Sequence, residues 1–120
     1  MPRVIADGVL ITGISGGEYG SRGFVDGWDL KSGEKKWHRW TTAAPGEPGG
    51  DSWKGDAHKT GGAPTWLTGS YDPELNLVYW GIGNPGPDWN PKQRPGDNLY
   101  ADSAIALDAD TGKLKWHFQF

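Results

Sequence analysis

The stretch that decides the fold is residues 61–84, GGAPTWLTGSYDPELNLVYWGIGN. Residues 65–70 are β-branched, aromatic or small, and residues 77–80 form a second run of strand-forming side chains. Between them, residues 72–76 contain a proline that presets a turn angle, flanked by Asp and Asn side chains that can hydrogen-bond their own backbone. The stretch therefore predicts a β-hairpin.

The rest of the chain alternates in the same way between short apolar runs and turn signals. Residues 14–22 are a glycine-rich loop, residues 42–59 are expected to form a long surface loop, and residues 85–96 hold four prolines and are expected to be irregular. No helical period with caps occurs, so the chain is predicted to be all-β. Further strands are expected at residues 4–5, 9–13, 24–30, 35–40, 103–108 and 113–119.

Composition fits one modest domain of 120 residues and excludes several classes of function. The net charge is −3 and the basic residues are scattered, so no nucleic-acid partner is expected. There are no cysteines, hence no disulfide or thiolate metal site, and no apolar run is long enough to span a membrane. The first residues lack a signal-peptide pattern, so we expect either a cytoplasmic protein or a beginning that lies upstream.

An internal repeat narrows the fold further. Residues 29–37, DLKSGEKKW, match residues 108–116, DADTGKLKW, with an Asp followed by a Gly four residues on and a Trp eight residues on. The Ser/Thr-Gly pair makes a tight turn, and the Trp is a large flat body that can stack between neighbouring sheets. Radially repeated four-stranded sheets, as in a propeller, explain this unit better than a β-sandwich, which would not need it twice.

Four motifs together resemble the quinoprotein alcohol dehydrogenases, enzymes of the methanol and ethanol dehydrogenase type that hold pyrroloquinoline quinone (PQQ). They are the repeat, ISGGEYGSRG at 14–23, GGAPTW at 61–66 and GIGNP at 81–85, which follow the order of that family. The resemblance covers essentially all 120 residues and implies about two four-stranded antiparallel blades of an eight-bladed β-propeller. The blades are expected at 1–41 and 61–120, with long loops at 42–60 and 85–100.

The resemblance also implies a site. Glu18 and Asn84 would bind Ca²⁺ or a lanthanide, since carboxylate and amide oxygens suit a hard cation. Trp66 would stack on the quinone, and the remaining cofactor contacts would come from Ser15, Gly16, Gly17, Thr65 and Arg22. Pro64 stands where the family often has a threonine, and it offers no donor. The residues alone also allow simpler roles: Glu18 as a solvated loop acid, Asn84 as a turn residue, Trp66 as part of the core and Arg22 as a structural partner of Glu18.

By the same resemblance, the chain is expected to be an internal part of a dehydrogenase that oxidises a primary alcohol to an aldehyde with a Ca²⁺-bound quinone. The catalytic base would lie beyond Phe120, so the 120 residues alone are expected to be inactive. A periplasmic parent, a cytochrome c electron acceptor and self-association through open blade edges are implied as well. Two alternatives stay open: a non-catalytic propeller scaffold, and a PQQ-dependent sugar dehydrogenase.

Overall fold

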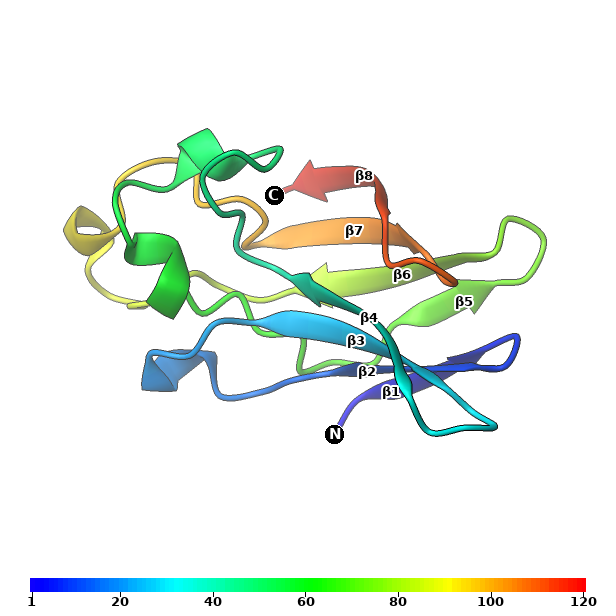
Figure 1. The fold of residues 1–120 in the computed structure, drawn as a ribbon. Coiled ribbons are helices and arrows are strands. Elements are labelled where there is room, and N and C mark those ends of the chain that lie inside the picture. Colours follow the sequence, from blue (N-terminus) through cyan, green and yellow to red (C-terminus); the bar gives the residue numbers. More distant parts are fainter.

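The structure, a computed structural model, describes all residues 1–120 and confirms the all-β fold. Eight strands form two four-stranded antiparallel sheets, and in each sheet the strand order follows the chain (Figure 1). The first sheet contains β1 (Arg3–Ala6), β2 (Val9–Gly13), β3 (Phe24–Asp29) and β4 (Lys35–Trp40), and the second contains β5 (Ser70–Asp72), β6 (Leu77–Ile82), β7 (Ser103–Asp108) and β8 (Leu114–Gln119). None of the helical segments is long and apolar enough to cross a membrane.

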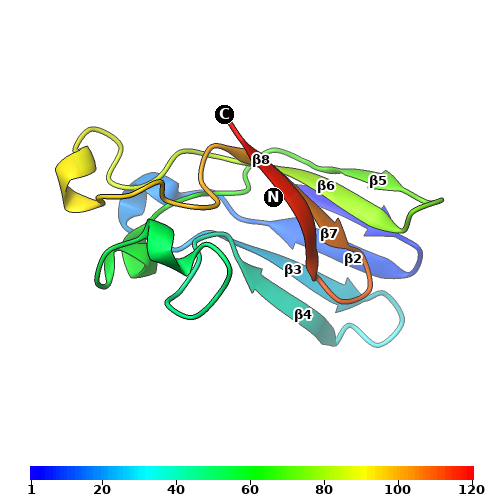
Figure 2. The same ribbon diagram turned by 90° about the horizontal axis from the view of Figure 1, so that it is seen from above.

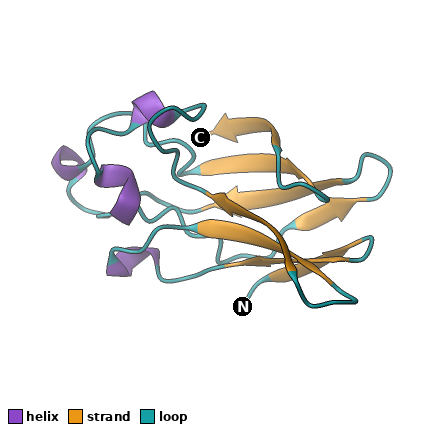
Figure 3. Cartoon of the chain, viewed as in Figure 1, coloured by secondary structure: helices purple, strands orange, loops and turns teal.

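Short and long connections lie at opposite ends of the sheets. Four single 3₁₀ turns fall within the long connections, and Figure 3 shows them gathered at one end of the molecule, away from the hairpin turns. They are η1 (Gly17–Tyr19), η2 (Gly50–Ser52), η3 (Ala57–Thr60) and η4 (Pro91–Gln93). The motif segments 14–23, 61–66 and 81–85 belong to or adjoin these connections, so they meet at this end.

The repeated Asp-to-Gly unit forms the same turn in both sheets. Asp29 Oδ1 accepts hydrogen bonds from the backbone N–H groups of residues 31 and 32, both at 2.8 Å, and Asp108 Oδ1 accepts from residues 110 and 111 at 3.0 Å. Gly33 and Gly112 then take φ values of 75° and 70°, a left-handed conformation that favours glycine. The turn is therefore determined by two residues that are visible in the sequence, the Asp that accepts the backbone hydrogen bonds and the Gly that adopts the left-handed conformation.

Trp37 joins the two sheets. Its indole Nε1 donates to the carbonyl of Ala109 at 3.0 Å, and its ring lies over Gly112, where an added Cβ would come within 2.4 Å. The two sheets pack against each other (Figure 2) and share one core cluster that includes Val9, Trp80 and Trp37. The equivalent Trp116 of the second sheet has no such partner and is 47% exposed, against 8% for Trp37.

The first arm of the predicted hairpin is much shorter than expected. The strand begins at Ser70, and Thr65 is buried in a non-strand segment instead. The physical reason is that this segment bonds to neighbouring loops: Thr65 N–H donates to the carbonyl of Ile14 at 2.8 Å, and the Pro64 carbonyl accepts from Gly83 at 2.8 Å.

Residues 42–59 contain no strand, as expected for a loop, but the segment is not wholly on the surface. Thr42, Trp53 and His58 are buried, and Trp53 Nε1 donates to the carbonyl of Leu99 at 2.6 Å. Residues 45–48 and 54–56 remain exposed, so this loop is anchored by a few buried side chains and otherwise lies at the surface.

Candidate functional site

The site is organised around the segment 61–66, which runs between two motif loops. On one side, Gly23 N–H donates to the Gly62 carbonyl at 2.7 Å and Ile14 N–H donates to Thr65 Oγ1 at 2.7 Å. On the other side, Ala63 N–H donates to the Asn84 carbonyl at 2.9 Å. These hydrogen bonds hold the loop at 14–23 and the segment at 81–85 on either side of segment 61–66.

The ring of Pro64 packs between the two motif loops, against Gly17 on one side and Gly83 on the other. A Cβ added at Gly17 would lie 2.7 Å from Pro64 Cδ, and one added at Gly83 would lie 3.0 Å from Pro64 Cγ. Both glycines therefore leave space that the proline ring fills. Each glycine directly precedes a predicted ligand, Glu18 or Asn84, so the packing against Pro64 fixes the backbone position of both ligands.

Five of the eight predicted site residues line one partly open cavity of about 320 Å³. A smaller cavity of about 180 Å³, between β4 and the buried loop, contains none of them. Pro64 completes the lining of the larger cavity. The five predicted residues are Ser15, Gly16, Glu18, Trp66 and Asn84.

Glu18 and Asn84 present oxygen donors to this cavity. The Glu18 carboxylate, in η1, forms no hydrogen bond or ion pair in the structure. Asn84 Nδ2 donates to Asp88 Oδ1 at 2.6 Å and to the Pro85 carbonyl at 3.2 Å, which leaves Oδ1 as the free end of the amide. No group of three or more His, Cys, Asp or Glu side chains could hold a metal ion, so these two oxygens need further ligands from a bound molecule.

Trp66 provides a flat apolar wall. It is 56% exposed, although a Trp side chain normally buries most of its large surface in a core or interface. Its exposed indole beside two free oxygen donors fits a planar ligand that carries its own metal-binding atoms. The residues present therefore fit a quinone together with a hard cation.

Three predicted cofactor residues do not line the cavity. Gly17 is buried under Pro64, and the Thr65 hydroxyl donates to the Phe24 carbonyl at 2.8 Å while it accepts from Ile14. The Arg22 guanidinium donates to the Thr42 side chain and carbonyl at 2.8 and 2.7 Å and lies 4.4 Å from the centre of the Trp40 ring. Burial lowers the pKa of Arg22, with a partly opposing effect of Glu47, and no ion pair with Glu18 forms.

A second cavity adjoins the first, and sequence reasoning missed it. Its volume is about 350 Å³, and Glu18 lines both cavities. Its other walls include Asp88 and Trp89, and Trp89 is 95% exposed. The proline-rich composition of residues 85–96 predicted only irregular backbone. The available clue was the Asp88-Trp89 pair, which follows the GIGNP motif after two further residues.

Comparisons with known proteins agree with this geometry. A family model described as PQQ, the β-propeller domain of glucose/ethanol/alcohol dehydrogenases, matches residues 1–120. The quinoprotein alcohol dehydrogenase PedH of Pseudomonas putida is 45% identical over 97% of this chain and 22% of its own length. The lanthanide-dependent methanol dehydrogenase of Methylorubrum extorquens is 46% identical over 92% of this chain and 21% of its own length.

Solved structures of such dehydrogenases share the fold of this chain. A europium-containing methanol dehydrogenase superposes with a TM-score of 0.90 at 34% identity, over 98% of this chain and 23% of that chain. The quinohemoprotein alcohol dehydrogenase of Comamonas testosteroni gives 0.87 at 37% identity, over 98% and 20%. The chain spans about a fifth of the length of the curated relatives it matches. It belongs to the PQQ β-propeller family of glucose, ethanol and alcohol dehydrogenases.

Proposed function

We propose that this chain forms the cation-binding and quinone-stacking part of a PQQ-dependent alcohol dehydrogenase that oxidises a primary alcohol to an aldehyde. The observation that carries the proposal is the convergence of a free carboxylate, a free amide oxygen and an exposed indole on one cavity. Family membership supports the choice of cofactor, and the names of the relatives support an alcohol as substrate.

In this proposal, Glu18 and the Oδ1 atom of Asn84 bind Ca²⁺ or a lanthanide ion. The names of the lanthanide-dependent and europium-containing relatives support including the trivalent ions. The Ser15 hydroxyl and the backbone of Gly16 contact the acidic groups of the cofactor, and Trp66 stacks on its rings. Pro64, which has no N–H and no polar side chain, shapes the cavity without donating to the ligand.

Bound PQQ would supply the carbonyl that takes up the electrons of the alcohol, polarised by the cation as a Lewis acid. The residues of this chain hold and orient these groups, because η1 and the Gly83–Asn84 segment fix the two oxygen donors through Pro64. The group that accepts the alcohol proton is proposed to lie outside residues 1–120.

Absorbance titration with PQQ and Ca²⁺ tests the proposal. We expect a cation-dependent shift of the quinone absorbance with the wild-type chain, and its loss in Glu18→Gln and Trp66→Ala. Matched controls are Glu74→Gln, an exposed carboxylate in the β5–β6 turn, and Trp116→Ala, an exposed indole far along the chain; both keep the shift. No shift with any cation would contradict the proposal and favour a non-catalytic scaffold.

For the whole protein, we infer a cytochrome-type electron acceptor and a periplasmic location. The relatives named methanol dehydrogenase [cytochrome c] subunit 1, 38% identical in Methylorubrum extorquens and 40% in Paracoccus denitrificans, support the acceptor. Reduction of an added cytochrome c by the parent protein with PQQ and alcohol would test it, and reduction of a small dye alone would contradict it.

A further inference from the structure

Asp88 lies directly behind one of the proposed cation ligands. Its Oδ1 atom accepts a hydrogen bond of 2.6 Å from Asn84 Nδ2, and Asp88 forms none of the ion pairs of the chain. Asp88 lines the second cavity and not the first, so it does not itself face the proposed cation position.

This contact decides which end of the Asn84 amide faces the first cavity. The oxygen and nitrogen ends of an amide have nearly the same shape, so only hydrogen-bond partners distinguish them. An ionised carboxylate accepts and never donates, so Asp88 can bind only Nδ2 and turns Oδ1 away from itself. A cation needs the oxygen, hence the orientation enforced by Asp88 is the one that permits binding.

The Arg94 side chain connects the loop that carries Asp88 to the interior of the protein through hydrogen bonds. The Arg94 side chain donates to the carbonyls of Pro87 at 3.0 Å and of Asp88 at 3.4 Å. It also donates to Asn98 Oδ1 at 3.0 Å, and Asn98 is only 3% exposed and binds the carbonyl of Ser52 through its Nδ2. Arg94 therefore links the backbone carbonyls of Pro87 and Asp88 to one buried residue, Asn98.

Asp88 also adds a negative charge to the second cavity, and this carboxylate forms no ion pair. Glu18 and Asp88 both line the second cavity, Glu18 also lines the first, and neither carboxylate forms an ion pair with a Lys or Arg. Coulomb attraction grows in proportion to the charge of the bound ion, so a trivalent ion gains more from this second carboxylate than a divalent ion does.

We propose that Asp88 is a positioning residue: it orients the Asn84 amide for cation binding and biases the site toward trivalent over divalent ions. The inference rests on the proposed function, because it takes Glu18 and Asn84 as the ligands. Outer partners of metal ligands commonly change affinity by about 10- to 100-fold when removed.

Terbium luminescence provides the test, since a nearby indole such as Trp66 sensitises bound Tb³⁺. With PQQ present to complete the ligand set, apparent affinities for Tb³⁺, and for Ca²⁺ by competition, are measured with the full chain and with D88A, D88N and the control D97A. Asp97 is an exposed carboxylate of the same connection whose side chain makes no hydrogen bond. Far-UV circular dichroism confirms that each variant is folded.

We expect D88A to weaken Tb³⁺ binding about tenfold or more. D88N keeps an acceptor for Asn84 Nδ2, so it restores Ca²⁺ binding but lowers the Tb³⁺-to-Ca²⁺ affinity ratio, and D97A behaves as wild type. If D88A does not fold, the Tb³⁺-to-Ca²⁺ affinity ratio of D88N alone tests the inference. Wild-type affinity and an unchanged ratio in the Asp88 variants would overturn this inference alone. No Tb³⁺ binding by the wild-type chain in the presence of PQQ would overturn both it and the proposed function.

Discussion

Pro64 is the residue on which the proposed ligands depend most. It fills the space left by the missing side chains of Gly17 and Gly83, and it lines the cavity itself. The two ligands follow these glycines immediately, so a shift of the proline ring moves both.

Gly17→Ala tests this dependence. The new Cβ would meet the Pro64 ring at 2.7 Å, so we expect a loss of about 1–3 kcal/mol in the free energy of unfolding and weaker PQQ and cation binding. Gly81→Ala is the control, because nothing lies within 4 Å of its added Cβ. Urea denaturation and the absorbance titration measure the two effects. Equal stability and binding in both variants would contradict the role given to Pro64.

At this scale, some of the residues predicted for the site line one cavity and others do not. Glu18, Trp66 and Asn84 were found because each belongs to a motif with its own local pattern, and the structure brings them to one cavity. Arg22 and Thr65 were assigned to the cofactor although their partners, Thr42 and Phe24, lie 20 and 41 residues away in the sequence. Such pairings depend on how loops cross in space, which local chemistry does not specify.

At the scale of elements, the Asp-led turns set the strand boundaries. The same arrangement recurs a third time at Asp72, whose Oδ1 accepts from the backbone of residues 74 and 75 at 2.9 and 3.1 Å. In this third copy Asn76 replaces the glycine and takes a φ of 53°. Because these turns are local, most predicted strands were confirmed within a residue or two, whereas the segment 65–70 failed because its partners are distant loops.

Asp108→Ala removes the acceptor of two backbone N–H groups in the β7–β8 turn. We expect a loss of about 1 kcal/mol in the free energy of unfolding, the usual net value of such hydrogen bonds. Asp97→Ala is the comparison, because the Asp97 side chain is exposed and makes no hydrogen bond. Denaturant unfolding of both variants checks this, and identical midpoints would show that the turn does not depend on the carboxylate.

The same turns predict an acid-dependent loss of stability. Hydrogen bonds from the backbone of Ser32 and Lys31 lower the pKa of Asp29. Burial would raise the pKa of Asp108, but hydrogen bonds from Thr111 and Asp110 outweigh it and lower the pKa. A folded-state pKa below the unfolded value gives stability that is present above about pH 4 and lost as the pH falls through the folded-state pKa.

The double variant D29N/D108N keeps the acceptor oxygens but does not titrate. We therefore expect its unfolding midpoint to fall less than that of wild type between about pH 5 and about pH 3. Parallel pH profiles for the two proteins would show that these carboxylates carry no linked stability.

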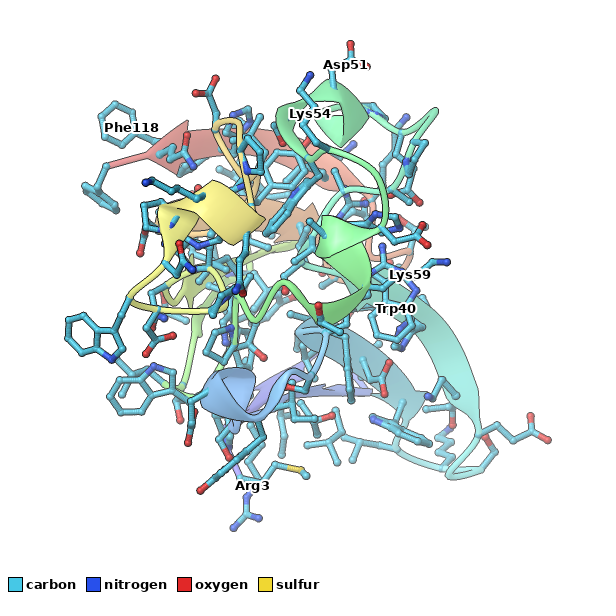
Figure 4. All side chains as sticks on the ribbon, turned by 90° about the vertical axis from the view of Figure 1, so that its left-hand side faces the viewer. Arg3, Trp40, Asp51, Lys54, Lys59 and Phe118 are labelled. Atoms are coloured by element: carbon cyan, nitrogen blue, oxygen red, sulfur yellow. The ribbon has the colours of Figure 1, made fainter.

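At the scale of the whole molecule, Trp37 and Trp116 occupy equivalent places in different surroundings. Trp37 is buried against Ala109 and Gly112, whereas Trp116 is half exposed and Phe118 projects outward from β8 (Figure 4). The repeat in the sequence predicted both as docking residues, but only the structure shows which one has a partner within residues 1–120.

This difference gives a matched pair of substitutions. Trp37→Ala should cost about 3–5 kcal/mol in the free energy of unfolding, because it removes the buried contact between the sheets. Trp116→Ala should change it by less than about 1 kcal/mol, as expected for an exposed position. Thermal or urea unfolding measures both, and a similar loss in the two variants would contradict the docking assignment.

Open apolar surface on β8 also predicts association. The exposed side chains Trp116, Phe118 and Phe120 lie along and just beyond this strand, whose outer edge has no partner. We expect the apparent mass from light scattering to rise with concentration in wild type and to stay near 13.0 kDa in Trp116→Glu. A concentration-independent monomer in wild type would exclude association through this face.

The proposed function depends on one cation, held by Glu18 and Asn84, that lies beside the indole of Trp66. Anomalous diffraction from a crystal of the chain grown with PQQ and a lanthanide would locate this cation. We expect one strong peak at about 2.3–2.6 Å from oxygens of Glu18 and Asn84, with the quinone rings stacked on Trp66. A peak elsewhere, or a quinone bound away from Trp66, would contradict it.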